Sequence, residues 1–406
     1  MRVLALGGAG GMGRHLCRTA LHLDGIDELT VADLDETAAH RFAAELTTPG
    51  SPVQVRALGL DVTDPAALHS ALTRADAVVN TVGPFYRFGV PVLTAAIDAR
   101  CHYLDICDDW EPTAAMLGLS ARARAAGVTA VIGMGATPGL SNLLAVYAAR
   151  ELDSVHDLVT GWNVEAGGLD ATGPGVSAAI VHGIAQMTGT IRVLRDGRYT
   201  DERPLRRTPL DYPGLGRRTA WTFGHPEPIT LPRTLAATTS VNVTTGSRSF
   251  LAFMRATRWA VDHRVLSPAR AARLAQTAER RLPSPPLDRL VGPDRLPPLF
   301  ALATGTHAGR PASVGVALCH FPGTTMGAVT GIPLAVALEQ LTTGALTAPG
   351  VHAPEAALDP DRYFAALAPH CPGAPRPEAM TAITRSWDPD PATAYRTAIT
   401  DALAAH

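Results

Sequence analysis

Arg2-Val-Leu-Ala-Leu-Gly-Gly-Ala-Gly-Gly-Met-Gly13 is the stretch that decides the fold of this chain. Its first five residues are almost wholly apolar, as expected of a strand buried on both faces of a parallel sheet. A glycine-rich run follows at once, then an amphipathic segment over 14–23 and a second apolar run that ends on Asp33. The order strand, glycine-rich turn, helix and strand predicts a dinucleotide-binding βαβ unit.

Three glycines of this run fill a G-x-G-x-x-G pattern, and each has its own physical duty. Gly8 permits the tight turn, Gly10 lets the backbone approach a pyrophosphate, and Gly13 lets helix and strand pack closely. The diphosphate then lies on the N–H groups of the helix N-terminus, where the helix dipole favours negative charge. A purely structural unit that binds nothing is the alternative interpretation.

The acidic residue of the pattern is Asp33, about 20 residues after Gly13, which is the spacing that the fingerprint requires. A carboxylate there accepts hydrogen bonds from ribose hydroxyls and repels a 2′-phosphate, and residues 34–36 offer no arginine to hold one. We therefore expect NAD as the cofactor, with NADP as the alternative. Further cofactor contacts are expected at Ala9, Gly11, Met12, Leu34, Asp61, Val62, Asn80, Thr81, Val82, Gly83, Pro84 and Gly135.

Composition narrows the class of protein. The 406 residues are 46 % hydrophobic and 18 % charged, which is typical of a globular chain long enough for two domains. The net charge of −2 gives no electrostatic reason to expect nucleic acid or a membrane as a partner. The first strand starts at residue 2, which leaves no room for a signal peptide, and no apolar run reaches membrane-spanning length, so a cytoplasmic location is expected.

Cysteine and lysine usage restricts the chemistry further. The five cysteines are scattered and form no C-x-x-C pattern, so we expect reduced thiols and no metal site. All 35 basic residues are arginine, and a chain without lysine cannot form a Schiff base with a carbonyl substrate.

Strands and helices alternate over the first 150 residues, which predicts a Rossmann-type, doubly wound parallel sheet of the α/β class. Open sheets of this kind bind ligands at the carboxyl edge of their strands. Two strand exits, 81–85 and the glycine-rich 133–139, lie at that edge, and the second opens a helix over 140–150. The other predicted helices are 36–46, 65–72, 90–99 and 113–126, and the other strands 53–58, 77–80, 102–105 and 128–132.

The pattern changes from about residue 153, where antiparallel hairpins join the helices. We expect an inserted mixed-sheet α/β domain for substrate binding and dimerisation at 151–320, a return to the Rossmann domain at 321–371 and an extension at 372–406, either a packed helix or a loose tail. Chain breaks are expected at 167–168 and 173–175, a hairpin turn at 196–197, loop and short strands over 203–235, helix over most of 256–281, a linker at 282–298 and a hairpin over 299–318.

Four motifs together resemble the saccharopine dehydrogenase-like oxidoreductases: the N-terminal glycine run, 79–85, 102–105 and 135–142. The stretches 330–335 and 350–355 are similar to that family's C-terminal segment. The resemblance implies a Rossmann domain with an inserted catalytic domain, in a homodimer. Pro138-Gly139 is closer to the saccharopine and polyamine branch than to the enoyl reductases. Two features depart from the family: Asp33 stands where saccharopine reductase prefers NADP-binding residues, and the inserted domain matches no defined substrate.

Proton carriers cluster after the predicted strand 102–105. The candidates for catalysis are Asp105, Cys107 and Tyr86, since a side chain within hydrogen-bond reach could protonate a reduced nitrogen. His102, Tyr103, Asp108 and Asp109 lie in the same stretch. Each has a plain structural alternative, such as a cap at a strand end or a small buried residue.

Substrate contacts are expected at the second glycine-rich loop and the helix after it. Pro138 and Gly139 would lie near the nicotinamide carboxamide or the substrate, and the helix N-terminus with Ser141 and Asn142 could hold a carboxylate. Trp162 could line the substrate cleft or be a core residue. Arginine forks could bind substrate carboxylates, or be ordinary solvated cations, at Arg203, Arg206, Arg207, Arg217, Arg218 and Arg233.

Three functions remain open. The first is hydride transfer at a carbon–nitrogen bond: reduction of an imine formed from an amine and an oxo acid, or the reverse, on an amino acid or amine. The second is trans-acting reduction of a carbon–carbon double bond on a lipid or carrier-bound substrate. The third is a non-enzymatic sensor or scaffold that binds NAD.

Overall fold

The computed structural model describes residues 1–168, 176–281, 285, 290, 292 and 294–404. The described chain divides into two compact units. Residues 1–139 and 325–359 form the first unit, and 140–168, 176–324 and 360–404 form the second. The break expected at 173–175 and most of the linker expected at 282–298 lie outside the described residues.

The first unit is built on a seven-stranded sheet in which every pairing is parallel. The strand order is β15-β6-β5-β4-β1-β2-β3, which confirms the doubly wound α/β sheet. The strands are β1 (Arg2–Leu6), β2 (Glu28–Asp33), β3 (Gln54–Gly59), β4 (Ala77–Asn80), β5 (His102–Asp105), β6 (Thr129–Val131) and β15 (Gly350–His352).

Local signals mark the start of some helices of this unit. The side chains of Asp35 and Asp64 accept hydrogen bonds from the first turns of α2 and α3. The helix expected over 113–126 is two helices, separated at Gly118, because glycine disfavours a helix interior. The helices are α1 (Gly11–Ala20), α2 (Glu36–Leu46), α3 (Pro65–Leu72), α4 (Phe85–Asp98), α5 (Trp110–Leu117), α6 (Ser120–Ala126), α13 (Met326–Thr342) and α14 (Pro354–Ala357).

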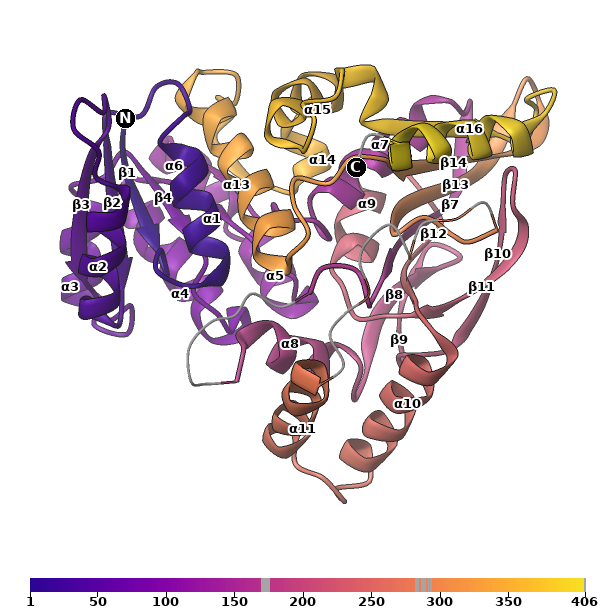
Figure 1. Ribbon diagram of the computed structural model, residues 1–406, viewed down its shortest axis with the longest axis horizontal. Coiled ribbons are helices and arrows are strands. Elements are labelled where there is room, and N and C mark those ends of the chain that lie inside the picture. Colours follow the sequence, from indigo (N-terminus) through magenta and orange to yellow (C-terminus); the bar gives the residue numbers. More distant parts are fainter. Residues whose placement is uncertain (169–175, 282–284, 286–289, 291, 293, 405–406) are drawn as a thin grey trace. The chain divides into compact units, whose positions relative to one another are not determined.

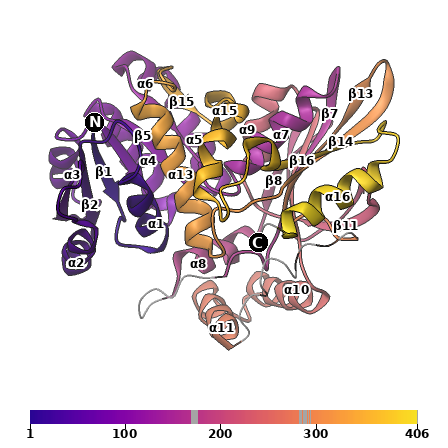
Figure 2. The same cartoon turned by 45° about the horizontal axis from the view of Figure 1, so that its top comes forward.

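Helix α13 brings a late part of the chain back to the first βαβ unit. It lies beside α1, in orange next to indigo in Figures 1 and 2. A Cβ atom at Gly331 would lie 2.3 Å from the Met12 carbonyl oxygen, so only glycine lets the two backbones come this close. Residues 325–359 therefore complete the unit that contains the glycine-rich turn.

The second unit is built on a nine-stranded mixed sheet. Its main order is β10-β11-β12-β7-β13-β14-β16, with β8 paired to β12 and to β9; β12 and β7 run parallel and the other neighbours antiparallel. The strands are β7 (Ser154–Asn163), β8 (Ile191–Arg195), β9 (Arg198–Glu202), β10 (Arg207–Tyr212), β11 (Gly216–Thr222), β12 (Thr239–Thr245), β13 (Leu299–His307), β14 (Arg310–Leu318) and β16 (Thr381–Arg385).

Seven α-helices of the described chain belong to this unit: α7 (Leu140–Arg150), α8 (Ala178–Gln186), α9 (Glu227–Leu235), α10 (Arg248–Asp262), α11 (Pro268–Arg281), α15 (Pro360–Leu367) and α16 (Pro391–Ala404). The stretch 203–235, expected as loop and short strands, contains the strands β10 and β11 and also helix α9. The mostly helical stretch expected over 256–281 is covered by the helix pair α10 and α11. The Asp196-Gly197 hairpin and the 299–318 hairpin are confirmed.

The unit boundaries fall at 139, 325 and 359, whereas the sequence led us to expect 150, 320 and 371. The first difference arises because α7 packs on β7, β13 and β14 of the second sheet. The C-terminal region is packed through β16, which pairs with β14, and through Arg385, which forms an ion pair with Glu151 at 2.7 Å. Within the described ranges, no helix is long and apolar enough to cross a bilayer.

Candidate functional site

The glycine-rich turn between β1 and α1 has the shape that a dinucleotide needs. A Cβ atom at Gly13 would lie 2.2 Å from the Gly7 carbonyl oxygen, so this position must stay without a side chain. At Gly10, which precedes α1, no side chain caps the helix, and a Cβ would approach only the Gly7 oxygen, at 3.2 Å. The N-terminal amides of α1 are therefore not covered by a capping side chain, and the residues present fit a bound diphosphate.

Asp33, the last residue of β2, is held beside this turn. One carboxylate oxygen accepts a hydrogen bond from the Ala9 backbone N–H at 3.2 Å, and the other accepts from the Asp35 N–H at the same distance. The neighbouring Leu34 is 74 % exposed. The carboxylate thus lies where the ribose of a dinucleotide is expected, next to the glycine turn.

A buried polar chain joins the carboxyl ends of β4 and β5. The Tyr103 hydroxyl donates to the Asp105 carboxylate at 2.8 Å and accepts from the Asn80 amide at 3.1 Å. The Asn80 side-chain oxygen accepts from the Val82 N–H at 3.0 Å. Asn80 therefore fixes the start of the 82–84 loop, one of the expected cofactor contacts.

Asp105 also fixes the loop that follows β6. Its carboxylate accepts from the N–H groups of Cys107 at 3.0 Å and Gly133 at 2.7 Å, and its carbonyl accepts from the Met134 N–H at 2.7 Å. Farther along, the Gly135 N–H donates to the Pro138 carbonyl at 2.9 Å. One carboxylate thus connects two loops at the same edge of the sheet.

Burial dominates the titration of this edge. It raises the pKa of Asp105 from 3.8 to about 6, against the opposing effect of its hydrogen bonds from Cys107, Gly133 and Tyr103. Burial also raises the pKa of Tyr103 and of Cys107 well above their ordinary values. The Cys107 thiol is therefore neutral near pH 7, and the Asp105 carboxyl group gains or loses its proton near pH 6.

The three candidate catalytic residues differ in exposure. Asp105 and Cys107 are fully buried, and the Cys107 sulfur lies 3.5 Å from the Thr113 hydroxyl. Tyr86, in the first turn of α4, is 60 % exposed. His102 accepts a hydrogen bond from the Thr129 N–H at 3.0 Å, across the sheet. Of the three candidates, Tyr86 is the one with a surface available to a substrate.

Other expected residues have plain local partners. Thr81 donates to the Leu6 carbonyl at 2.9 Å, and the exposed Asp61 accepts from the N–H and hydroxyl of Thr63, which lower its pKa.

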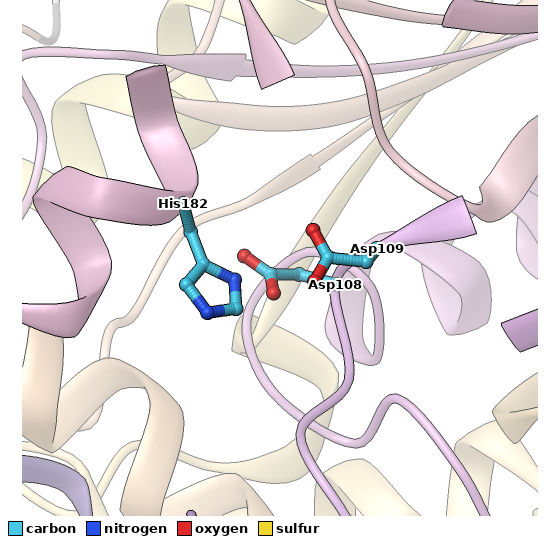
Figure 3. Close-up of side chains that lie close together, drawn as sticks. All are labelled: Asp108, Asp109 and His182. Carbon is cyan, nitrogen blue, oxygen red and sulfur yellow. The ribbon is translucent and has the colours of Figure 1, made fainter. Parts of the chain in front are cut away.

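Figure 3 shows Asp108 and Asp109 on the loop after β5, which belongs to the first unit. Its third labelled residue, His182, belongs to α8 of the second unit.

A second buried polar cluster lies entirely within the second unit. At the start of α7, Ser141 donates to the Glu227 carboxylate at 2.8 Å, and Asn142 donates to the Thr230 hydroxyl at 3.2 Å. Asn242 of β12 also donates to Glu227, at 3.1 Å. Ser141, Asn142, Glu227 and Asn242 are fully buried. Two expected substrate residues are therefore brought together with a carboxylate.

His225 and Trp162 continue this cluster. A ring nitrogen of His225 lies 3.8 Å from the Glu227 carboxylate, and its ring stacks on Trp162 with centroids 5.5 Å apart. His225 is 3 % exposed. His225 and Glu227 were not among the residues expected from the sequence. The signal that could have found them is His-Pro-Glu-Pro at 225–228, because proline is common in the first turn of a helix and would have indicated α9 here.

Of the six arginines considered as carboxylate ligands, Arg218 is half-buried and the other five are exposed: Arg203, Arg206, Arg207, Arg217 and Arg233. Arg206 forms an ion pair with Glu202, and Arg218 donates to the Asp294 carbonyl. Their positions fit the alternative interpretation as solvated cations.

Comparison with known proteins agrees with this geometry. Residues 3–131, which contain the glycine turn, Asp33 and Asp105, match the family model described as the saccharopine dehydrogenase NADP binding domain. This match shows that residues 3–131 are similar to the NADP-binding domains of that family. A saccharopine dehydrogenase NADP-binding domain binds a nicotinamide dinucleotide, which agrees with the cofactor expected from the glycine pattern.

Two curated relatives match through this saccharopine dehydrogenase-type domain. One is a probable mitochondrial saccharopine dehydrogenase-like oxidoreductase of Arabidopsis thaliana, 31 % identical over 27 % of this chain. The other is the saccharopine dehydrogenase [NADP(+), L-glutamate-forming] of Saccharomyces cerevisiae, 30 % identical over 30 % of this chain. Each match spans 26 % of the relative's length.

A solved structure extends the likeness in fold to both units. Apo saccharopine dehydrogenase (L-Glu forming) from Saccharomyces cerevisiae superposes with a TM-score of 0.60 at 18 % identity, and the alignment covers 90 % of this chain and 96 % of that one. The second unit thus follows the saccharopine dehydrogenase fold.

Proposed function

We propose that this chain is an NAD(P)-dependent oxidoreductase that transfers hydride at a carbon–nitrogen bond. It would reduce an imine formed from an amine and an oxo acid, or run the reverse oxidation. One observation carries the proposal: the Asp33 carboxylate accepts a hydrogen bond from the Ala9 N–H, beside a glycine-rich turn whose helix has no capping side chain. This turn lies in a stretch that matches the saccharopine dehydrogenase NADP binding domain.

The first unit would hold the cofactor. The amides at Gly10, Gly11 and Met12 would bind the diphosphate, and Asp33 the ribose hydroxyls, which favours NAD over NADP. Leu34, Asp61 and Val62 would lie on the adenosine side. Thr81, Val82, Gly83, Pro84 and Gly135 would lie on the nicotinamide side. The bound nicotinamide supplies or takes the hydride.

Protonation at nitrogen would come from the carboxyl edge of this sheet. Tyr86 is our candidate proton donor because its side chain is exposed, whereas Asp105 and Cys107 are buried. Asp105 would act through the loops that it fixes, by holding Cys107 and Gly133 in place. Protonation of Asp105 below its pKa of about 6 would weaken its hydrogen bonds from these two N–H groups, so the loops would be held less firmly at low pH.

The substrate would be a small amino acid or amine and its oxo acid partner. The candidate substrate contacts are taken in each unit by itself: Pro138 and Gly139 in the first, and Ser141, Asn142 and Trp162, with His225 and Glu227, in the second. Carbon–nitrogen chemistry is supported by the Pro138-Gly139 loop and by the yeast relative, whose name describes a saccharopine dehydrogenase that forms L-glutamate. We also propose that the chain forms a homodimer and acts in the cytoplasm.

The test is oxidation of NADH and NADPH, followed by nicotinamide absorbance, with a matrix of 2-oxo acids and amines. Turnover that requires both partners, with a secondary amine identified by mass spectrometry, would establish the reductive condensation. Tight NADH binding without turnover of any pair would count against carbon–nitrogen chemistry, and enoyl substrates would then be assayed.

A further inference from the structure

Helices α10 and α11 form a pair at one edge of the second unit (Figures 1 and 2). Their inward faces are part of its core, where Leu251, Met254, Ala271 and Ala272 are buried together. These contacts explain why the pair is held in place. They leave the opposite faces without a partner inside the described part of the unit.

The outward face of α10 is apolar, which is unusual for a surface helix. Phe253 is 39 % and Trp259 56 % exposed, and Ala256 is exposed between them at helical spacing. Val265 in the connecting turn and Leu274 of α11 are also more than half exposed. Four of the eight large hydrophobic side chains exposed in the described chain lie on this one helix pair.

The same segment is strongly cationic. Residues 248–281 contain eight arginines and two acidic residues, a net charge of +6 in a chain whose net charge is −2. Arg255, Arg264, Arg270 and Arg273 are exposed beside the apolar side chains. The charge of the whole chain gave no reason to expect a membrane partner, because it hides this local excess.

We propose that the outward face of α10 and α11 binds an anionic lipid surface. Arginines with exposed tryptophan, phenylalanine and leucine are the pattern of helices that lie in the plane of a membrane interface. A second copy of this chain fits the face less well, because a two-fold contact would set one cationic patch against another. Adsorption of this kind requires no membrane-spanning helix.

The test uses the full chain and lipid vesicles. Co-sedimentation is measured with vesicles of phosphatidylcholine alone and of phosphatidylcholine mixed with phosphatidylglycerol, at low and high salt. We expect binding to the mixed vesicles at low salt, little to phosphatidylcholine alone, and release at high salt because salt screens the charges. Equal binding to both vesicles, or to neither, would overturn the proposal.

Matched variants locate the surface. Trp259→Ser with Phe253→Ser should abolish vesicle binding, whereas Tyr199→Ser, which removes a 46 % exposed aromatic from β9, should leave it unchanged. Arg264→Gln should lower the partition coefficient about fivefold, and Arg310→Gln of the β14 hairpin should not. All five positions are exposed, so folding is not at stake. Gel filtration completes the set: a dimer that dissociates in the Trp259→Ser variant would assign the face to self-association instead.

Discussion

The Tyr103 hydroxyl and the Asp105 carboxylate lie 2.8 Å apart, both fully buried, at the carboxyl edge of the nucleotide-binding sheet. The carboxylate also receives two backbone N–H groups, from Cys107 and Gly133. A carboxylate with three donors would ordinarily have a low pKa, so the raised value of about 6 shows that burial outweighs the hydrogen bonds.

Asp105 should therefore make folding stability depend on pH in the direction opposite to most carboxylates. Its folded pKa, about 6, exceeds the ordinary 3.8, so the folded state binds more protons between pH 4 and 6. Its contribution is fully present below about pH 4 and is lost, by about 3 kcal/mol, as pH rises through 6. Urea unfolding of the wild type and Asp105→Asn from pH 4 to 8 measures this. The stability difference should fall with rising pH; a constant difference would contradict the assignment.

The cofactor preference should follow Asp33. Replacing it in Asp33→Ser with Leu34→Arg removes the carboxylate that repels a 2′-phosphate and adds a cation to hold one. The ratio of NADPH to NADH affinity should rise by about tenfold or more, since a hydrogen bond to a charged group contributes about 1.5–3 kcal/mol. Leu34→Arg alone, which keeps the carboxylate, should shift the ratio less. An unchanged ratio in the double variant would remove Asp33 from the site.

The strands, the glycine-rich turn and the helix starts of the first unit could be predicted from the sequence because their signals are local. Gly8, Gly10 and Gly13 follow a buried strand directly, Asp33 ends the next one, and Asp35 and Asp64 cap the helices after them. Each of these interactions joins residues close in the chain, or follows from the known handedness and order of a βαβ unit.

The second cluster could not be found in the same way. Glu227 of α9 meets Ser141 across 86 residues of the chain, and it meets Asn242 only because α9 packs against β12, which no local pattern encodes. The stretch 203–235 is rich in proline and arginine, so its sequence predicts loop and short strands and does not indicate helix α9. The boundary at 139 was missed for a related reason: the sequence predicts helix α7 but not the sheet on which it packs.

Gly139 should be required for the loop that follows β6. Its φ is +120°, and a Cβ atom there would lie 2.1 Å from the Gly135 carbonyl oxygen. Gly139→Ala should destabilise the protein by about 2 kcal/mol or more and lower turnover more than NADH affinity, because the expected diphosphate and ribose contacts lie at the glycine turn and Asp33. Gly183→Ala is the control, because a Cβ in that helical position meets nothing within 4 Å. Equal effects of the two variants on thermal unfolding would show that the loop does not need its glycine.

Glu227 should affect the substrate and not the cofactor. Glu227→Gln keeps an oxygen for Ser141 and Asn242 but removes the charge that faces His225, 3.8 Å away. If this cluster contacts the amine or the oxo acid, KM for that partner should rise about tenfold or more while the dissociation constant of NADH stays the same. Steady-state kinetics of each substrate and fluorescence titration of NADH separate the two quantities.

Glu165→Gln is the matched control for this experiment. Glu165 is a half-buried carboxylate of the same unit that also accepts hydrogen bonds from a serine, Ser247, and not from Ser141 or Asn242. It should leave both KM values unchanged. Comparing KM with the thermal unfolding temperature of Glu227→Gln distinguishes a role in binding from mere support of the fold. A variant with reduced thermal stability but an unaltered KM would make Glu227 a structural residue.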